Sequence, residues 1–159
     1  MKEAGIHPVI GPRAVPVELH SAGHGGREHG GTTTTQEPVS PAAPVAPSAE
    51  AIRRRIESYV QRQTQTDGTF VIEDQETGAT RRLQFIRVHH RVGKSGEFYY
   101  SCTDMRDINT GELLDLDFDV LASNGTLEVV DTRIHKVEGK ARYTYDKKDH
   151  RVPVPLSAR

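Results

Sequence analysis

Leu114-Asp115-Leu116-Asp117-Phe118-Asp119-Val120 alternates strictly between apolar and acidic residues. Successive side chains of a β-strand point to opposite faces of a sheet, so the apolar residues share one face and the aspartates share the other. This pattern is typical of a strand that has one face on a hydrophobic core and one face toward water. The stretch therefore predicts an antiparallel sheet with a single covered face.

Turn residues recur on both sides of this strand and divide the chain into six runs rich in β-branched and aromatic side chains. Connections this short force antiparallel neighbours, so we expect an up-and-down meander of about six strands. The expected strands are residues 69–75, 80–92, 97–105, 112–121, 126–137 and 141–145.

One amphipathic helix is expected before the meander. Ser48 is a good N-cap, and the helix should begin at Ala49 and run to about Gln65. Its apolar stripe consists of Ile52, Ile56, Tyr59 and Val60. The predicted fold class is therefore α+β, with one N-terminal helix packed on the apolar face of a curved antiparallel β-meander.

The register of the fifth strand can be argued from its turn. Asn124-Gly125 favours a two-residue type I′ turn, but the register that this turn sets would mix core and solvent faces further along the pair. A β-bulge near Val129-Val130 removes the conflict and places Leu116 opposite Ile134.

The same register predicts two polar cross-strand pairs on the outer face. Asp117 should face Arg133, and Asp115 should face His135. Metal binding and acid/base catalysis by these side chains are the less favoured alternatives, since exposed pairs of this kind are usually structural. After the next turn, we expect Ile134 to pair with Tyr143 and Thr132 to pair with Tyr145.

Composition divides the chain into three parts. Residues 1–48 hold seven of the nine prolines and none of the nine aromatic residues, which predicts a flexible leader that is rich first in Gly and His and then in Thr and Pro. Residues 49–150 should form the domain, and residues 151–159 a C-terminal tail. A Thr/Pro spacer of this kind favours an extracytoplasmic protein, periplasmic or secreted, whose signal would not be part of this chain.

The overall charge and the motif content exclude several classes. A net charge of -1 gives no basic excess for nucleic acid, and we expect neither a nucleic-acid partner nor a transmembrane segment. The single Cys102 cannot by itself build a disulfide framework or a thiolate zinc site. Motifs typical of nucleotide, haem, esterase and zinc-protease sites are missing, so we expect no enzyme activity and no cofactor.

Three groups of residues are candidates for a site. His90, Tyr100 and Asp104 could line a small-ligand pocket if all three point inward, although a core histidine bonded to a neighbour is the simpler interpretation of His90. Cys102 is interpreted as a small buried hydrophobe rather than a nucleophile. The leader histidines could bind copper, nickel or zinc, although solvated histidines are the simpler interpretation. They are His20, His24 and His29.

A helix followed by a curved meander resembles the cystatin-like architecture and its NTF2-like relatives. The runs Phe98–Asp104, Leu114–Val120 and Ile134–Lys140 are similar to small uncharacterised bacterial envelope proteins of that shape. The inhibitory Gln-x-Val-x-Gly loop of cystatins is missing. No functional residue carries over from the resemblance. The leader, the balanced charge and the missing catalytic motifs favour a non-enzymatic binding or interaction domain held on a spacer, with another protein or an envelope component as partner.

Two alternatives stay open. One is an NTF2-like ligand binder or isomerase with a pocket between helix and sheet, and the other is metal handling by the leader histidines. Self-association through an exposed edge strand is a further expectation.

Overall fold

The computed structural model describes residues 42–159, so the leader histidines His20, His24 and His29 lie outside the described residues. The first element is α1 (Ala49–Gln63). Ser48 caps it as predicted, because its hydroxyl accepts a hydrogen bond of 3.1 Å from the backbone N–H of Ala51. No helix in the described part of the chain is long and apolar enough to cross a membrane.

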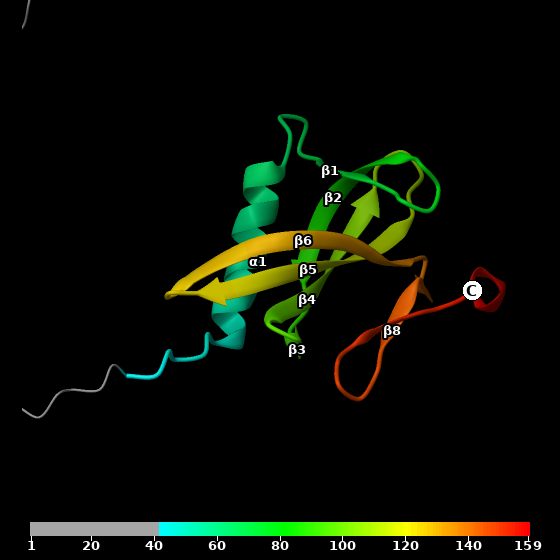
Figure 1. The fold of residues 1–159 in the computed structure, drawn as a ribbon. Coiled ribbons are helices and arrows are strands. Elements are labelled where there is room, and N and C mark those ends of the chain that lie inside the picture. Colours follow the sequence, from blue (N-terminus) through cyan, green and yellow to red (C-terminus); the bar gives the residue numbers. More distant parts are fainter. Residues whose placement is uncertain (1–41) are drawn as a thin grey trace, which may run out of the picture. The chain divides into compact units, whose positions relative to one another are not determined.

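A curled antiparallel sheet follows the helix (Figure 1), in agreement with the predicted α+β fold. Its strands lie in the order β1-β2-β4-β5-β6-β7, and β3 pairs with the first three residues of β4. The bounds are β1 (Phe70–Glu73), β2 (Thr80–Val88), β3 (Gly93–Ser95), β4 (Phe98–Asp107), β5 (Leu113–Ser123), β6 (Thr126–Val137) and β7 (Lys140–Ala141).

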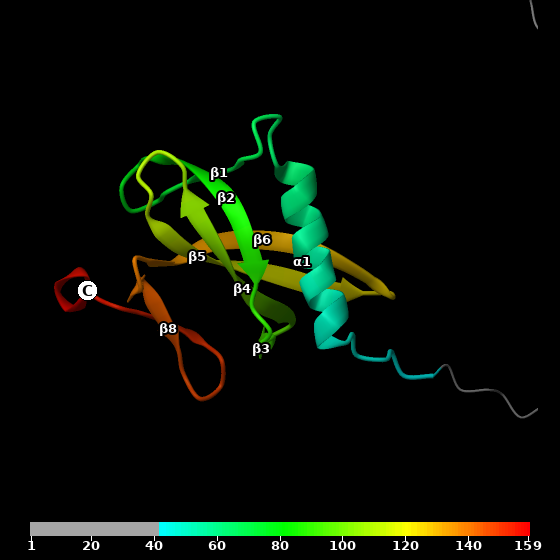
Figure 2. The ribbon, with the colours of Figure 1, turned by 180° about the vertical axis from the view of Figure 1, so that it is seen from behind.

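The hydrophobic core lies between α1 and one face of the sheet, and Figures 1 and 2 show the helix along that side. Ile52 and Ile56 on the helix are 0% exposed, as are Leu116 and Phe118 on β5. The apolar residues of the stretch Leu114–Val120 therefore point to the helix, as their alternation predicted. Val60, Phe70, Leu83, Met105, Leu114, Val120 and Ile134 complete the buried cluster.

The predicted register of β5 and β6 is largely confirmed. Ser123 pairs with Thr126, Leu116 pairs with Ile134, and Val130 is skipped in a bulge between the pairs of Asp119 and Val120. Asn124 and Gly125 adopt positive φ angles of 50° and 76°, as a type I′ turn requires.

One predicted cross-strand pair is wrong and another is only a backbone pair. A second bulge skips His135, so Asp115 pairs with Lys136 instead. Asp117 does pair with Arg133 in the backbone register, but the guanidinium of Arg133 bonds Asp131 on its own strand at 2.6 Å. The predicted Asp117–Arg133 side-chain contact is therefore not formed.

The end of the chain differs most from the prediction. Tyr143 and Tyr145 do not pair with β6; they form β8 (Tyr143–Tyr145), which pairs with β9 (Arg151–Pro153) in a separate hairpin. A short 3-10 helix, Leu156–Ala158, follows. Residues 151–159 are thus not a tail, because β9 contributes half of this hairpin, which lies on the side of the sheet away from α1 (Figures 1 and 2).

A buried ion-pair network holds the base of the hairpin to the sheet. Asp74, which is 0% exposed, accepts hydrogen bonds from Arg81 at 3.1 Å and from Arg142 at 2.7 and 2.9 Å. Arg81 also pairs with Asp107 at 3.1 Å and with Glu112 at 2.5 Å. The first turn of the sheet, the turn between β4 and β5, and the residue before β8 are therefore tied together at one point.

Candidate functional site

The face of the sheet opposite α1 carries the polar cluster of this protein. Alternation places Tyr100, Cys102 and Asp104 of β4 on this face, next to the aspartates of β5. Contrary to expectation, these aspartates are not all in water: Asp117 and Asp119 are 1% and 5% exposed. The β8–β9 hairpin is what removes them from solvent, since its side chains bond both carboxyl groups.

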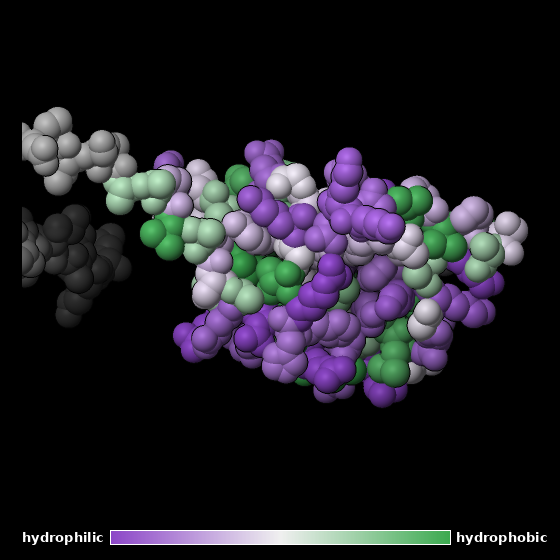
Figure 3. Space-filling model, turned by 90° about the horizontal axis from the view of Figure 1, so that it is seen from below, coloured by the Kyte–Doolittle hydropathy of each residue, from purple (hydrophilic) through white to green (hydrophobic). Residues whose placement is uncertain are grey.

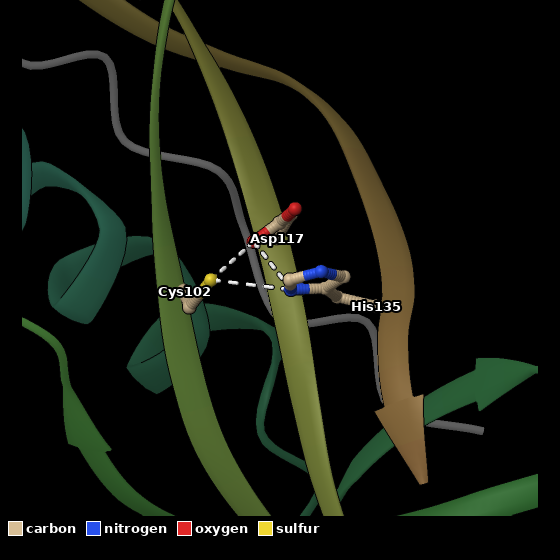
Figure 4. A group of neighbouring side chains, drawn as sticks. All are labelled: Cys102, Asp117 and His135. Atoms are coloured by element: carbon tan, nitrogen blue, oxygen red, sulfur yellow. Dashed lines mark hydrogen bonds and ion pairs between the residues drawn. The ribbon is translucent and has the colours of Figure 1, made fainter. Parts of the chain in front are cut away.

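Cys102, Asp117 and His135 meet at the centre of this face, one from each of β4, β5 and β6 (Figure 4). The Cys102 thiol donates to Asp117 Oδ1 at 2.7 Å. His135 Nδ1 lies 3.5 Å from the Cys102 sulfur and 3.8 Å from Asp117 Oδ1. A sulfur, an oxygen and a nitrogen donor therefore converge on one point.

The local backbone explains how His135 joins this group. His135 is the extra residue of the second β6 bulge, between Ile134, which points to the core, and Lys136, which pairs with Asp115. A bulge of this type redirects a side chain without ending the strand. Both His135 and Lys136 therefore lie on the acidic face, where Lys136 Nζ is 3.6 Å from Asp115.

Two tyrosines of β8 orient the Asp117 carboxyl group. Tyr143 and Tyr145 both donate their hydroxyls to Oδ2, at 2.6 and 2.5 Å. Together with the thiol on Oδ1, this carboxyl group accepts three hydrogen bonds, as suits an ionised carboxylate. The second oxygen is occupied by the hairpin, so Oδ1 is the one that faces Cys102 and His135.

The orientation of the His135 ring is fixed in a similar way. Nε2 lies 3.0 Å from the backbone carbonyl of Tyr143, which can only accept, so Nε2 carries the proton. The ring also stacks on Tyr143, with centroids 4.6 Å apart. In the neutral imidazole, Nδ1 is then unprotonated, and its lone pair points toward the thiol and Asp117.

The hairpin is held in place by an ion pair and a group of aromatic rings. Arg151 bonds Asp119 through two nitrogens, at 2.9 and 2.5 Å, and donates to the Tyr145 hydroxyl at 3.1 Å. Tyr145 stacks nearly parallel on Tyr100, at 4.3 Å and 7°. The rings thus shield the ion pair and fix the two hydroxyls over Asp117.

Electrostatics at this site disfavour a reactive thiolate. Burial raises the pKa of the Cys102 thiol well above its usual value, and the charge of Asp117 raises it further. Burial also lowers the pKa of His135, so the imidazolium partner that a nucleophilic thiolate needs is disfavoured. Burial, followed by Asp117, raises the pKa of Tyr143 and Tyr145, which keeps both hydroxyls protonated as donors.

The three donor atoms suit a tetrahedral zinc-class ion. Zinc is bound by Cys, His and Asp side chains, and its usual bond lengths place sulfur and nitrogen about 3.6 Å apart and oxygen and nitrogen about 3.4 Å apart. The corresponding distances here are 3.5 and 3.8 Å. Only the 2.7 Å between sulfur and Oδ1 must widen, by less than about 1 Å, once the thiol proton that joins them is replaced by an ion.

A second cluster lies beside the first on the same face. His89 Nε2 is 2.6 Å from Asp104, which also accepts from Arg87 at 2.7 Å and pairs in register with Asp115. These three side chains, His89, Asp104 and Asp115, also approach one another closely enough to share an ion. Asp104 is already paired with the cation of Arg87, however, so this cluster is the weaker candidate.

The predicted ligand-binding residues do not come together. His90 is exposed and lies at the helix side, where its Nδ1 is 3.0 Å from Arg53. Tyr100 and Asp104 lie on the opposite face, where Tyr100 donates to Asp149 at 3.0 Å and Asp104 bonds His89. The condition for a shared pocket, that His90, Tyr100 and Asp104 all point inward, is therefore not met. A bulge between Phe85 and Arg87 changes the phase of β2, which alternation alone did not show.

The predicted interpretation of Cys102 needs correction as well, because its thiol is hydrogen-bonded within a polar cluster. Sequence reasoning missed the convergence with Asp117 and His135, since it assigned the aspartates to water. One signal was available: Tyr143-Thr144-Tyr145 places two hydroxyls on one face of a strand, and Arg151 follows them in the supposed tail.

Comparison of the chain with family models, with curated proteins and with solved structures gave no match.

Proposed function

We propose that this chain is a non-enzymatic binding domain whose ligand is a zinc-class transition-metal ion, held by Cys102, Asp117 and His135. The observation that carries the proposal is the convergence of three different donor atoms, Sγ, Oδ1 and Nδ1, within 3.8 Å of one another. Thiolate, imidazole and carboxylate together form a donor set that zinc accepts readily.

The groups around the three donors support this function. Ligating histidines usually donate their other ring nitrogen to a carbonyl or carboxylate, and ligating carboxylates are themselves hydrogen-bonded. Tyr143 meets both requirements, because its carbonyl accepts from His135 and its hydroxyl donates to Asp117. The ligands are thus held before any ion arrives, which lowers the entropic cost of binding.

A cysteine nucleophile is the competing use of the same residues. Nucleophilic catalysis needs a stable thiolate, but burial and Asp117 raise the pKa of the Cys102 thiol. A bound cation reverses this effect, because its positive charge stabilises thiolate and carboxylate together. The negative charge of Asp117, which disfavours Cys102 as a nucleophile, therefore favours Cys102 as a metal ligand.

Several wider expectations belong to the same proposal. The predicted Thr/Pro-rich leader would hold the domain away from a surface, and an extracytoplasmic location would fit a protein that captures an ion outside the cytoplasm. The cystatin-like resemblance remains a prediction about shape. Figure 3 shows a face on which hydrophilic residues predominate and apolar residues are scattered, which does not favour a broad apolar docking surface there.

The direct test is titration of the metal-free chain with Co²⁺. A cobalt–thiolate bond gives a charge-transfer band in the near ultraviolet, and the chain has a single cysteine, so this band reports on Cys102 alone. We expect a band that saturates at one equivalent, that Zn²⁺ abolishes by displacement, and that is lost in Cys102→Ala and strongly weakened in His135→Ala.

The leader histidines require a control, because they can bind Co²⁺ without a thiolate. A variant with His20→Ala, His24→Ala and His29→Ala should keep the full band. His90→Ala is the matched control for His135→Ala, since His90 is exposed on the other side of the sheet. Folded wild-type protein that shows no thiolate band at millimolar Co²⁺ would overturn the proposed function.

A further inference from the structure

A small pocket opens directly beside the donor atoms. It has a volume of about 180 Å³, and its lining includes two of the three proposed ligands, Cys102 and His135, but not Asp117. Asp117 closes the inner side of the site, where its side chain is 0% exposed. An ion bound by the three donors would therefore turn its remaining coordination position toward this pocket.

The walls of the pocket are basic. Of the seven lining residues in the described part of the chain, Arg91 and Lys136 are cations, and none is an aspartate or glutamate. Each cation has a carboxylate partner, Asp149 for Arg91 at 3.0 Å and Asp115 for Lys136 at 3.6 Å, but neither partner lines the pocket. A guanidinium has five N–H donors and an ammonium has three, so a single carboxylate partner does not use all the donors of either cation.

The tyrosine hydroxyls of the wall already donate hydrogen bonds within the protein. The Tyr100 hydroxyl donates to Asp149, and the Tyr145 hydroxyl donates to Asp117. Hydrogen-bond donors for a ligand therefore come mainly from Arg91 and Lys136, with His89 beside them. Cationic donors of this kind favour a negatively charged ligand over a neutral one.

We infer that the fourth ligand of the metal is a small anion of carboxylate size, taken up in the pocket between Arg91 and Lys136. This inference rests on the proposed function, because the anion is placed at the open position of that ion. Thiolate and carboxylate together neutralise a divalent ion, so the attraction for the anion must come from the rim cations. A four-coordinate zinc-class ion with three protein ligands leaves one position for an exogenous ligand.

The volume of the pocket limits the size of the ligand. Pockets that take drug-sized molecules measure roughly 300–1,000 Å³, whereas this one is about 180 Å³. A two- or three-carbon carboxylate fits such a space together with a few water molecules. A peptide or a nucleotide would be too large to reach the ion.

The experiment uses the full chain loaded with Co²⁺ and titrated with acetate, with azide, and with neutral acetamide as the control. The visible d–d bands of cobalt respond to its fourth ligand, while the near-ultraviolet thiolate band reports that Cys102 remains bound. We expect acetate and azide to change the d–d bands in a saturable way and acetamide to leave them unchanged.

Variants test the role of the rim. Arg91→Gln and Lys136→Gln should each weaken the affinity for acetate about 1.4- to fivefold, because single partly exposed charges contribute about 0.2–1 kcal/mol. The matched control is Lys94→Gln, since Lys94 lies over the Tyr99 ring and does not line the pocket. The thiolate band is recorded for each variant in the same sample.

The two proposals fail in distinguishable ways. If no thiolate band forms, the metal site itself is wrong. If the band forms but acetate and azide leave the d–d bands unchanged, or if acetamide acts as strongly as acetate, the anion inference is wrong and the metal site stands. Acetate binding of equal affinity to the metal-free chain would also overturn the inference, since the anion would then not be a ligand of the ion.

Discussion

Asp119 and Arg151 form a two-point ion pair, with Nη1–Oδ2 and Nη2–Oδ1 distances of 2.9 and 2.5 Å, that joins the centre of β5 to the β8–β9 hairpin. The side chains are 6% and 17% exposed, so the pair is largely removed from solvent. Together with the hydrogen bonds from Tyr143 and Tyr145 to Asp117, it holds the hairpin over the polar face of the sheet.

Arg151→Ala should detach the hairpin. Removing one partner of a buried pair leaves an uncompensated charge on Asp119 and costs about 3 kcal/mol of unfolding free energy. Amide hydrogen exchange should rise in β8 and β9, while the amides of β4 and β5 stay protected. Arg133→Ala is the matched control, because the side chains of Arg133 and its partner Asp131 are 51% and 41% exposed, and it should cost less than about 1 kcal/mol. Equal exchange rates in the two variants would contradict the prediction.

Tyr145→Phe should weaken metal binding without removing a ligand. The change deletes one of two hydroxyls that orient Asp117 Oδ2, and loss of such outer contacts typically costs about 10- to 100-fold in metal affinity. Competition between Co²⁺ and a chelator measures the loss. Tyr99→Phe, whose ring packs against the hydrophobic core, should leave the affinity unchanged. An unaltered affinity in Tyr145→Phe would show that the hairpin does not orient the site.

Asp74 should make the fold sensitive to acid. The hydrogen bonds from Arg142 hold the pKa of the Asp74 carboxyl group well below its ordinary value of 3.8. A lowered native pKa contributes stability that is fully present above pH 3.8 and is lost as the pH falls through the native value. Urea unfolding at a series of pH values should therefore show a decline below about pH 4.

Asp74→Asn is the matching variant. It should be destabilised by about 3 kcal/mol at neutral pH, because Arg81 and Arg142 lose a buried counter-charge. Its stability should also fall less steeply in acid than that of the wild type. Parallel pH profiles for the two proteins would exclude Asp74 as the acid-sensitive group.

Ile56→Ala should destabilise the core by about 3 kcal/mol. Ile56 is 0% exposed, and its removal leaves a cavity between α1 and the sheet. Ile86→Ala is the matched control, since Ile86 is 45% exposed and should cost less than about 1 kcal/mol. Chemical denaturation of both variants measures the difference, and similar values would mean that α1 is not packed on the sheet.

Gly93→Ala should disturb the aromatic group of the site. An added Cβ at position 93 would overlap the Tyr100 ring, which stacks on Tyr145 at 4.3 Å. We expect a loss of about 1–3 kcal/mol from overpacking. Tyr100→Ala should remove most of this additional loss when combined with Gly93→Ala, and the double-mutant cycle gives the coupling between the two positions. Independent, additive losses would show that the clash is not with Tyr100.

Most of the sheet could be predicted because its signals are local. The alternation from Leu114 to Val120 determines which face is buried, and Asn124-Gly125 together with the phase change at Val129-Val130 determines the register. These features depend on a period of two and on turn geometry, which the sequence contains directly. The N-cap at Ser48 is local in the same sense.

The candidate site could not be predicted because it depends on contacts between distant segments. Tyrosine suits either face of a sheet, since its ring is apolar and its hydroxyl is polar, so alternation could not decide between Ile134 and Asp117 as the partner of Tyr143. The burial of Asp117 requires a hairpin that pairs with itself rather than with β6. The bulge at His135 adds a second shift of the β5–β6 register, and no turn residue in the sequence indicates it.

Residues 143–153 follow the whole sheet in the chain, and they supply the hydroxyls and the guanidinium that enclose Asp117 and Asp119. No residue of this segment belongs to the hydrophobic core between α1 and the sheet. Substitutions in it should therefore change access to Asp117 and Asp119 without altering the packing of that core.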